Sequence, residues 1–437
     1  MHVNKLQTQI TRIADPVSNP ASQHSVRRVY LIDRKSGLPC ELEQDYIDHV
    51  LGTKAVNSQD KAGDELGFFR EWQFIQAESN PLWEDCATRA LRSELPMSQR
   101  EVDDFATFCN YEAKYAARYL FALRNGGSVE QSELVSTVSA GCLNGRIRTT
   151  LNFLSNLLDH GRKPQGLNDF EYYPHMAKIK SLLEASFARK LVPVPKQRSE
   201  LQSLNASETK AMEEMIAHHY LFKATPAGQR DALMIRTLRE TACRAGDLLK
   251  IKPEHVCGPN ADFDSAYITF MREPQSADDG RTFEPALKTG GGDLPISDEL
   301  FEALEQYILD LRRDAVDKRN DGIETAYLFV DHGGNRAYIG KEISQRNLNR
   351  VLKKLATNPA IRPSIHPHSL RHTGLTESAD SAHLSGKDGA EIEQLLTDMG
   401  RFAPGSAQIA HYTGRHVRAM TAKHKRTLDE EIRGKTR

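Results

Sequence analysis

Three segments in the second half of the chain concentrate side chains that can bind a phosphate group. The first, 241-TACRAGDLLKI-251, places Arg244 three residues before Asp247 at the end of an apolar helix. The second, 287-LKTGGGDLPIS-297, places Lys288 at the mouth of a glycine turn. The third, 366-HPHSLRHTGLT-376, places His368 and Arg371 on one face of a helix. Guanidinium groups stay charged at any working pH and hold phosphate oxygens through paired hydrogen bonds, so the pattern indicates phosphate chemistry.

Each segment also has a simpler interpretation. The arginine and acid of the first segment fit an ordinary ion pair on a helix, and the lysine of the second fits a solvated hairpin residue. In the third segment, His366, His368 and His372 are candidate metal ligands, which would make the protein a metalloenzyme. No Asp or Glu lies within that cluster, and no HExxH motif or paired cysteines accompany it. Metal analysis of the purified protein distinguishes these alternatives.

Taken together and in this order, the three segments resemble the tyrosine recombinase (phage-type integrase) family. That family has an arginine in a T-G-x-R-x-x-E segment, then a lysine in a β-hairpin, then the motif H-x-L-R-H-T. This chain has T-A-C-R-A-G-D, then Lys288, then the third motif intact at residues 368–373. The resemblance covers about residues 200–428 as the catalytic domain. More loosely, residues 60–190 look like the helical core-binding domain of the family, and residues 1–60 lie outside the resemblance.

The family resemblance also indicates a nucleophile. Family members carry L-G-H or L-G-W and then, after a short segment, a tyrosine. In this chain Met399-Gly400-Arg401 stands in that place, and Tyr412 follows as the matching tyrosine. An arginine replaces the customary His or Trp, and the polar insert 380–390 lengthens the distance from the preceding motif. The residues that could supply the missing imidazole are His411, His416 and His424.

The resemblance implies a role for each of the matched residues. A phosphodiester attacked by a phenol gains negative charge on its non-bridging oxygens, which Arg244 and Arg371 would clamp. Asp247 would orient Arg244. A phenol has an ordinary pKa near 10 and needs a proton acceptor, for which His368 is the candidate, while Lys288 would protonate the departing 5′-oxygen. Two arginines, a lysine and a histidine could neutralise the phosphate without Mg²⁺. The tyrosine–3′-phosphate bond conserves energy, so rejoining needs no ATP, and no cofactor is expected.

The net charge of the whole chain conceals strongly basic segments. The 437 residues include 58 Lys+Arg and 59 Asp+Glu, and the resulting net charge of -1 argues at first against nucleic acid. Residues 344–372, however, contain six basic residues and no acid. A neutral protein can therefore present a basic face to phosphates, with binding that depends strongly on salt. The candidate DNA-contacting residues are Arg146, Arg148, Lys190, Lys196, Arg198, Arg346, Arg350, Lys353 and Lys354.

Composition also bears on the compartment. The six cysteines are scattered and form no CxxC pair, which favours a reducing cytoplasm over a disulfide scaffold or zinc ribbon. No run approaches the roughly 20 apolar residues of a membrane span, and the N-terminus lacks the apolar core of a signal peptide. The sequence therefore predicts a cytoplasmic, nucleoid-associated protein of bacterial type with no membrane partner.

Most elements that must position these residues are predicted to be helices. Capping signals predict helices over Ser98–Arg124 and after Asn205. Apolar spacing predicts helices ending near Gly161 and over residues 231–251, 298–316 and 341–356. Residues 266–273 and the region of Lys288 read as short strands. The expected class is mainly α (α+β), with a helical core-binding domain and a mostly helical catalytic domain with a small antiparallel sheet. The expected domains are 1–60, an extension with no assigned role; 61–190, the helical DNA clamp; 191–200, a basic linker; and 201–437, the catalytic domain with its C-terminal tail.

These features predict a site-specific DNA recombinase that cuts and rejoins strands of double-stranded DNA. It is expected to act as a homotetramer on two DNA sites, as an integrase or transposase of a mobile element, with accessory recombinases or DNA-bending proteins as candidate partners. The main alternative is a catalytically inactive relative that binds DNA as an architectural protein, for which the arginine at position 401 is the best support. A topoisomerase-like relaxing activity would use the same chemistry, but the motif layout favours the recombinases.

Overall fold

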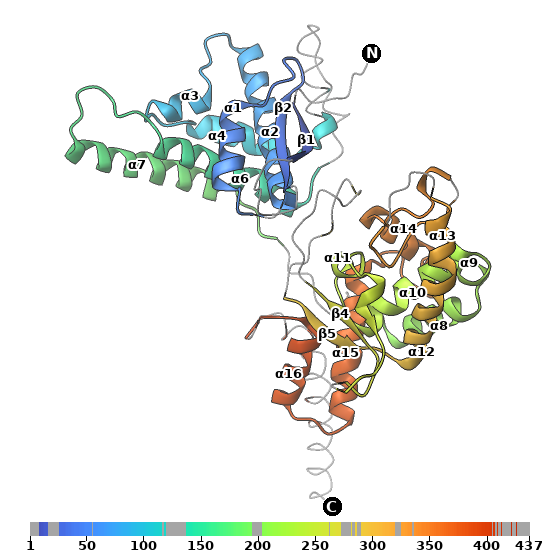
Figure 1. Cartoon of the computed structure of the whole chain (residues 1–437). Coiled ribbons are helices and arrows are strands. Elements are labelled where there is room, and N and C mark those ends of the chain that lie inside the picture. Colours follow the sequence, from blue (N-terminus) through green and yellow to red (C-terminus); the bar gives the residue numbers. More distant parts are fainter. Residues whose placement is uncertain are drawn as a thin grey trace, which may run out of the picture. The chain divides into compact units, whose positions relative to one another are not determined.

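The chain folds into two compact units, Met1–Lys196 and Gln197–Arg437. The computed structural model (Figure 1) describes residues 8–15, 26–54, 56–115, 118, 137–194, 203–261, 263–271, 281, 285, 290–319, 325–333, 336–403, 405, 406, 409, 412, 421 and 425. Both units are mostly helical, and the second holds a small antiparallel sheet, so the predicted fold class is confirmed.

The first unit pairs an antiparallel hairpin with a group of helices. Its elements are β1 (Thr8–Asp15), β2 (Val26–Asp33), α1 (Glu41–Asp45), a π-helical turn (Tyr46–Val50), α2 (Val56–Ser79), α3 (Cys86–Leu91), α4 (Gln99–Cys109), α6 (Ala140–Asp159) and α7 (Asp169–Ala188). The hairpin packs against α2, which also packs against α6. Val29, Leu31 and Ile47 belong to the same buried core as the helices, so the core continues across the boundary expected at residue 60.

Aromatic side chains fill much of this core. Phe69 packs edge-on against Phe105, with ring centroids 5.3 Å apart, and Trp72 contacts Phe105 at 5.4 Å. Helix α4 begins with the predicted capping box at Ser98. The helix predicted to reach Arg124 nevertheless ends at Cys109, because the chain turns at Asn110, whose carbonyl accepts a hydrogen bond from the amide of Val138. A local capping signal fixes where a helix starts, but this tertiary bond ends it.

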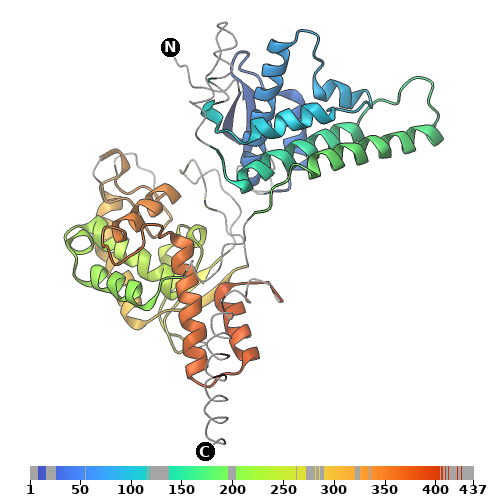
Figure 2. The same ribbon diagram turned by 180° about the vertical axis from the view of Figure 1, so that it is seen from behind.

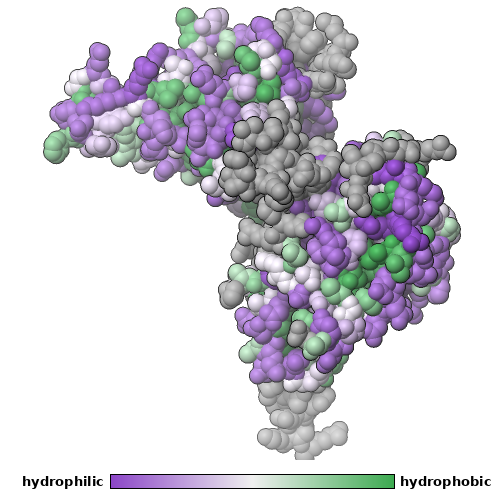
Figure 3. All heavy atoms as spheres, viewed as in Figure 1, coloured by the Kyte–Doolittle hydropathy of each residue, from purple (hydrophilic) through white to green (hydrophobic). Residues whose placement is uncertain are grey.

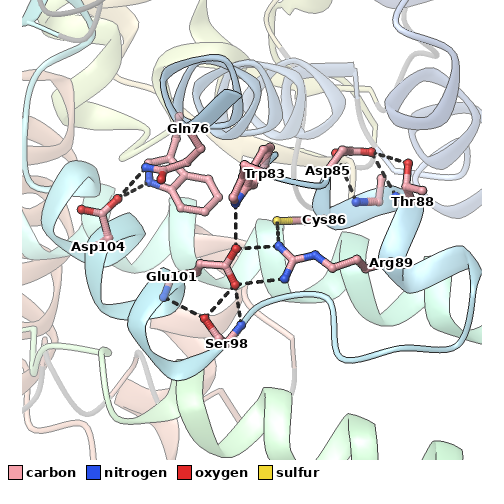
Figure 4. A network of polar contacts seen from close by, with 11 residues as sticks. Gln76, Trp83, Asp85, Cys86, Thr88, Arg89, Ser98, Glu101 and Asp104 are labelled. Carbon is pink, nitrogen blue, oxygen red and sulfur yellow. Dashed lines mark hydrogen bonds and ion pairs between the residues drawn. The ribbon is translucent and has the colours of Figure 1, made fainter. Parts of the chain in front are cut away.

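A polar network joins α3 to α4 around Glu101 (Figure 4). The Glu101 carboxylate accepts hydrogen bonds from Trp83 Nε1 at 2.8 Å and from both terminal nitrogens of Arg89 at 2.6 and 3.1 Å. The backbone and hydroxyl of Ser98 donate to it as well, at 2.7 and 2.8 Å. Burial raises the pKa of Glu101, but the bonds from Arg89, Ser98 and Trp83 outweigh it and lower the pKa from 4.5 to about 2.

The second unit surrounds a three-stranded antiparallel sheet, in the order β3-β4-β5, with helices. Its elements are α8 (Ala206–His218), α9 (Tyr220–Lys223), α10 (Pro226–Glu240), α11 (Ala245–Leu248), a 3-10 turn (Pro253–His255), β3 (Val256–Cys257), β4 (Tyr267–Phe270), β5 (Gly292–Pro295), α12 (Asp298–Tyr307), a π-helical turn (Ile308–Arg312), α13 (Arg313–Asp317), a 3-10 turn (Arg336–Tyr338), α14 (Gln345–Leu355), α15 (Pro367–Leu384) and α16 (Gly389–Gly400). Helices α15 and α16 lie side by side in both ribbon views (Figure 2).

Two sequence predictions for this unit need correction. The helix predicted over residues 231–251 breaks after α10, because Ala242 adopts a left-handed conformation with φ 47° that ends the helical hydrogen bonding. The glycines predicted as a hairpin turn instead run into strand β5, which begins at Gly292 opposite Phe270. A Cβ at Gly291 would lie 2.5 Å from the Phe270 carbonyl oxygen, so glycine allows the close approach of the strands.

The surface is largely hydrophilic on the face shown in Figure 3, with scattered apolar patches on both units. Within the described part of the chain, no helix is both long enough and apolar enough to span a bilayer. Across the same residues, no group of three or more His, Cys, Asp or Glu side chains is arranged to hold a metal ion.

Candidate active site

Helix α15 carries the H-x-L-R-H-T motif into the interior of the second unit. The helix starts at Pro367, and the His366 ring caps it by accepting a hydrogen bond from the Ser369 amide at 3.2 Å. Gly374 permits close packing on α10, because a Cβ there would lie 2.2 Å from the Arg239 carbonyl oxygen. Residues of this segment therefore both begin α15 and allow it to pack closely against α10.

Arg371 is the most deeply buried cation of the site, with 1% of its surface exposed. Its guanidinium donates to two backbone carbonyls from different segments, Ala242 O and Gly400 O, the latter at 2.6 Å. Burial and the nearby charge of Arg244 lower the pKa of Arg371 to about 10, so it remains protonated at neutral pH. The two carbonyls hold this charged group in one orientation.

The break between α10 and α11 presents Arg244 to the same region. Arg244 is the N-cap of α11, and its amide donates to Asp247 Oδ2 at 3.1 Å. Burial lowers the pKa of Arg244, while the Asp247 carboxylate acts in the opposite direction. The guanidinium carbons of Arg244 and Arg371 lie 6.0 and 5.1 Å from the ring centroid of Phe402, so the two arginines converge on one aromatic side chain.

Tyr412 lies beside these arginines, with 4% of its surface exposed. Its ring centroid is 5.8 Å from that of Phe402 and 4.9 Å from that of His372. Burial raises the pKa of Tyr412. The charge of Arg371, a hydrogen bond from Arg371 and the charge of Arg244 act in the opposite direction. The phenol is therefore protonated, in a cationic setting that would stabilise the phenolate formed when a proton acceptor takes its proton.

Two imidazoles stand next to the tyrosine. His368 Nε2 and His372 Nε2 are 2.8 Å apart, and the His372 ring lies against Tyr412. Burial, together with the positive charge of Arg371, lowers the pKa of His368, so its ring is neutral at pH 7 and can accept a proton. His368 and His372 thus form a hydrogen-bonded pair next to the phenol.

Arg401 directly follows α16. It adopts a left-handed conformation, with φ 47° and ψ 52°, and its guanidinium pairs with Asp247. Its guanidinium carbon lies 4.2 Å from the ring centroid of Phe270. Gly400 must be glycine for Phe402 to pack as it does, because a Cβ there would lie 2.1 Å from that ring.

The structure thus brings three of the predicted site residues together around one aromatic ring and connects three more to them. Arg244, Arg371 and Tyr412 meet around Phe402. Asp247 accepts a hydrogen bond from the Arg244 amide, and His368 is linked to Tyr412 through His372. Phe402 was not among the predicted site residues, and its only signal in the sequence is its place directly after the Met399-Gly400-Arg401 segment. The predicted residues Lys288, His411, His416 and His424 lie outside the described residues.

The predicted DNA-contacting residues fall into different settings. Arg146 is buried, donates to the Cys109 and Tyr111 carbonyls at 2.8 and 2.6 Å, and lies 3.6 Å above the Phe68 ring, so it holds the first unit together. Arg148, two residues further along α6 and therefore about 200° around the helix, is exposed.

The second unit offers a basic helix face. On α14, Arg346, Arg350 and Lys353 are exposed and recur at helical spacing, whereas Lys354 pairs with the buried Asp231 at 2.5 Å. Lys190, in the first unit, pairs with Asp103 at 2.9 Å. Lys196 and Arg198 lie outside the described residues.

The fold and the site define a mostly helical protein whose buried tyrosine is surrounded by arginines and histidines suited to phosphate chemistry. Residues 202–382 match the model of the phage integrase family. This match lies within the second unit and is to the family that the motifs of the sequence predicted.

Curated relatives point the same way. Tyrosine recombinase XerC of Oceanobacillus iheyensis is 26% identical over 195 residues, which are 44% of this chain and 53% of that protein. The chain thus spans about half the length of this relative. XerC of Anoxybacillus flavithermus is 24% identical over 262 residues, 59% of this chain and 72% of that protein.

Among solved structures, XerH site-specific recombinase bound to palindromic difH substrate, a post-cleavage complex, aligns with a TM-score of 0.49 and 14% identity, covering 90% of this chain and 85% of that one.

Proposed function

We propose that this protein is a site-specific DNA recombinase that cuts and rejoins DNA through a covalent 3′-phosphotyrosine intermediate. The observation that carries the proposal is the convergence of Arg244, Arg371 and Tyr412 around Phe402, with a pair of imidazoles beside the phenol. The XerC relatives, which are named as tyrosine recombinases, support recombination as the activity.

In the proposed reaction, the Tyr412 oxygen attacks the phosphorus of a phosphodiester. A phosphorus–oxygen bond to the tyrosine forms as the bond to the 5′-oxygen breaks. The phenol proton passes to the neighbouring imidazoles, with His368 as acceptor, and Lys288 donates a proton to the departing 5′-oxygen. Arg244 and Arg371 neutralise the charge that grows on the non-bridging oxygens, so the chain's own cations serve the role that a metal ion serves elsewhere. The reverse reaction, with a 5′-hydroxyl from another strand, completes an exchange without ATP.

The two units are proposed to share the work of DNA binding. Residues 61–190 would act as a core-binding clamp, residues 191–200 as a basic linker and residues 201–437 as the catalytic domain. The exposed face of α14, with Arg346, Arg350 and Lys353, and Arg148 on α6 would contact phosphates. Exchange between two duplexes calls for four active sites, so we propose a homotetramer on paired DNA sites. Integration, excision and transposition share this chemistry and differ in the arrangement of the two sites.

The decisive test is to trap the covalent intermediate. Purified protein is mixed with a pool of randomised duplexes that carry a nick, so that a short 5′-hydroxyl fragment diffuses away after cleavage and prevents religation. Wild type is expected to form an adduct that survives denaturation, and peptide mapping is expected to place the DNA on Tyr412. The matched control is Tyr220→Phe, which alters an exposed tyrosine of the same unit.

The outcomes of this test separate the alternatives. Tyr412→Phe should abolish the adduct, and Tyr220→Phe should leave it unchanged. An undiminished adduct with Tyr412→Phe would show that another residue is the nucleophile. DNA binding by wild type without any adduct would identify the inactive, architectural alternative.

A further inference from the structure

We propose that Arg401 is a positioning residue that acts through Asp247 to fix the backbone presenting Arg244 to the phosphate. The inference rests on the proposed function, since it assigns Arg244 to phosphate binding. It gives a role to the arginine that stands where the family customarily has a histidine or tryptophan.

The backbone at Arg401 is one that a long side chain seldom adopts. It ends α16 in the left-handed conformation, with φ 47°, where glycine is the favoured residue because it has no Cβ. A glycine at 401 would close the helix with less strain. The presence of arginine at this corner therefore indicates that its side chain does something that the helix end alone does not require.

The Arg401 side chain reaches Asp247 in the interior. Only 4% of the side chain is exposed, and the Asp247 side chain is fully buried. The same Asp247 oxygen, Oδ2, that pairs with the Arg401 guanidinium also accepts the amide hydrogen of Arg244 at 3.1 Å. One carboxylate oxygen thus connects the end of α16 to the first residue of α11. Because the guanidinium is always protonated, it keeps a positive partner beside this carboxylate at every working pH.

This connection runs parallel to the one made by Arg371. Arg371 joins the carbonyls of Ala242 and Gly400, which stand two residues before Arg244 and one residue before Arg401. The segment before Arg244 and the end of α16, from which the chain continues to Tyr412, are therefore connected by two sets of side-chain interactions. The first connection is made by Arg371, which also lies near Phe402 and Tyr412. The second is the ion pair between Arg401 and Asp247.

The hydrogen bonding of the pair favours a positional role over a purely stabilising one. Among the described residues, Arg401 Nε, Arg401 Nη1 and Asp247 Oδ1 are buried without hydrogen-bond partners. A buried ion pair with unsatisfied polar atoms contributes little more to stability than well-packed apolar residues of the same volume. What the pair supplies that apolar residues cannot is a fixed acceptor for the Arg244 amide.

The test compares Arg401→Met, Arg401→Lys and Arg401→His with wild type, using Arg313→Met as the control on an exposed arginine of α13. Single-turnover adduct formation on the nicked duplex gives the cleavage rate, and a filter assay gives the DNA Kd. Arg401→Met should lower the rate at least tenfold with less than a threefold change in Kd. Arg401→Lys should recover part of the loss, and Arg313→Met should match wild type. A rate for Arg401→Met within twofold of wild type would overturn the proposal.

The pH profile of Arg401→His gives a readout that a packing role would not move. The charged and titratable groups near position 401 are Asp247, Arg244 and Cys243 near α11 and Arg371 on α15. Asp293 on β5 and Glu393 and Asp398 on α16 line the same pocket as Arg401. An imidazolium paired with Asp247 has a raised pKa, so the pair is present at low pH and lost as pH rises through that pKa. The cleavage rate of Arg401→His relative to wild type should therefore fall between pH 6 and pH 8.5. A flat ratio would contradict the proposal.

Hydrogen exchange measures the same connection in the free protein and separates this inference from the proposed function. The amide of Arg244 should exchange faster in Arg401→Met than in wild type, while the Arg313→Met control shows no change there. If wild type forms no DNA adduct, the proposed function fails, and the exchange result still decides whether Arg401 positions Arg244. Unchanged protection of the Arg244 amide in Arg401→Met would refute the positioning role whatever the activity.

Discussion

Replacing Glu101 by glutamine should destabilise the first unit, because this carboxylate is the acceptor at the centre of the network in Figure 4. Glutamine retains one oxygen for Trp83 or Ser98, but it presents an amide group, itself a donor, toward Arg89. The Arg89 side chain is only 18% exposed and would lose its negative partner. The loss of a charge-assisted pair at a mostly buried site is the physical cause of the expected effect.

The size of the effect follows from the pKa of Glu101. Folding lowers that pKa from 4.5 to about 2. At about 1.36 kcal/mol per pKa unit, the ionised carboxylate contributes roughly 3 kcal/mol at pH 7. With 17% of the side chain exposed, screening by solvent removes little of this. Because the folded pKa is the lower one, the contribution is complete above pH 4.5 and is lost as pH falls toward 2. Linkage leaves roughly 1.5 kcal/mol at pH 3.

Tryptophan fluorescence during urea unfolding measures this directly in the whole chain. Trp72 and Trp83 are the only two tryptophans, and both lie in the first unit, so their signal reports that unit alone. Glu101→Gln should lower the free energy of unfolding by about 2 to 3 kcal/mol at pH 7 and by about half as much at pH 3. Glu94→Gln, at an exposed glutamate of the same unit, should change it by less than about 0.5 kcal/mol.

Two results would refute the reasoning. One is a loss for Glu101→Gln at pH 7 that is no larger than the loss for Glu94→Gln. The other is a loss that is the same at pH 3 and pH 7, which would mean that packing, and not the ionised carboxylate, is what the substitution removes.

Further substitutions test the division between structural and DNA-contacting cations. Arg146→Ala should destabilise the first unit by about 2 kcal/mol in the same fluorescence assay, because two buried carbonyls lose their donor, whereas Arg148→Ala should leave its stability unchanged. Arg350→Ala should weaken DNA binding and reduce the slope of log Kd against log salt concentration by about one, and an unchanged slope would remove this residue from the interface. Lys354→Ala should instead lower stability, measured by thermal unfolding, since it leaves a buried carboxylate unpaired. Arg371→Lys should slow adduct formation by about a hundredfold or more, because a lysine cannot hold two carbonyls and a phosphate in the guanidinium's fixed geometry; near wild-type cleavage would show that the charge alone suffices.

The sequence by itself predicted the match to the phage integrase family and the fold class, and it named the arginines and the tyrosine that converge on Phe402. The intact H-x-L-R-H-T motif identifies a helix whose histidine and arginine share a face, and α15 has that form. The capping boxes at Ser98 and Asn205 mark helix starts, and both are present. These features are local: hydrogen bonds within four residues and the 3.6-residue period decide them, so they can be read from neighbouring letters.

The tertiary structure decided which arginines and lysines are exposed to solvent and which contacts fix the positions of the site residues. Arg146 and Arg148 look alike in sequence, but only the folding of α6 onto Phe68 buries the first and leaves the second in solvent. The break at Ala242 and the tie from Arg401 to Asp247 depend on contacts between segments some 150 residues apart. Burial and long-range pairing set the charge and orientation of each group, and no local pattern in the chain encodes them.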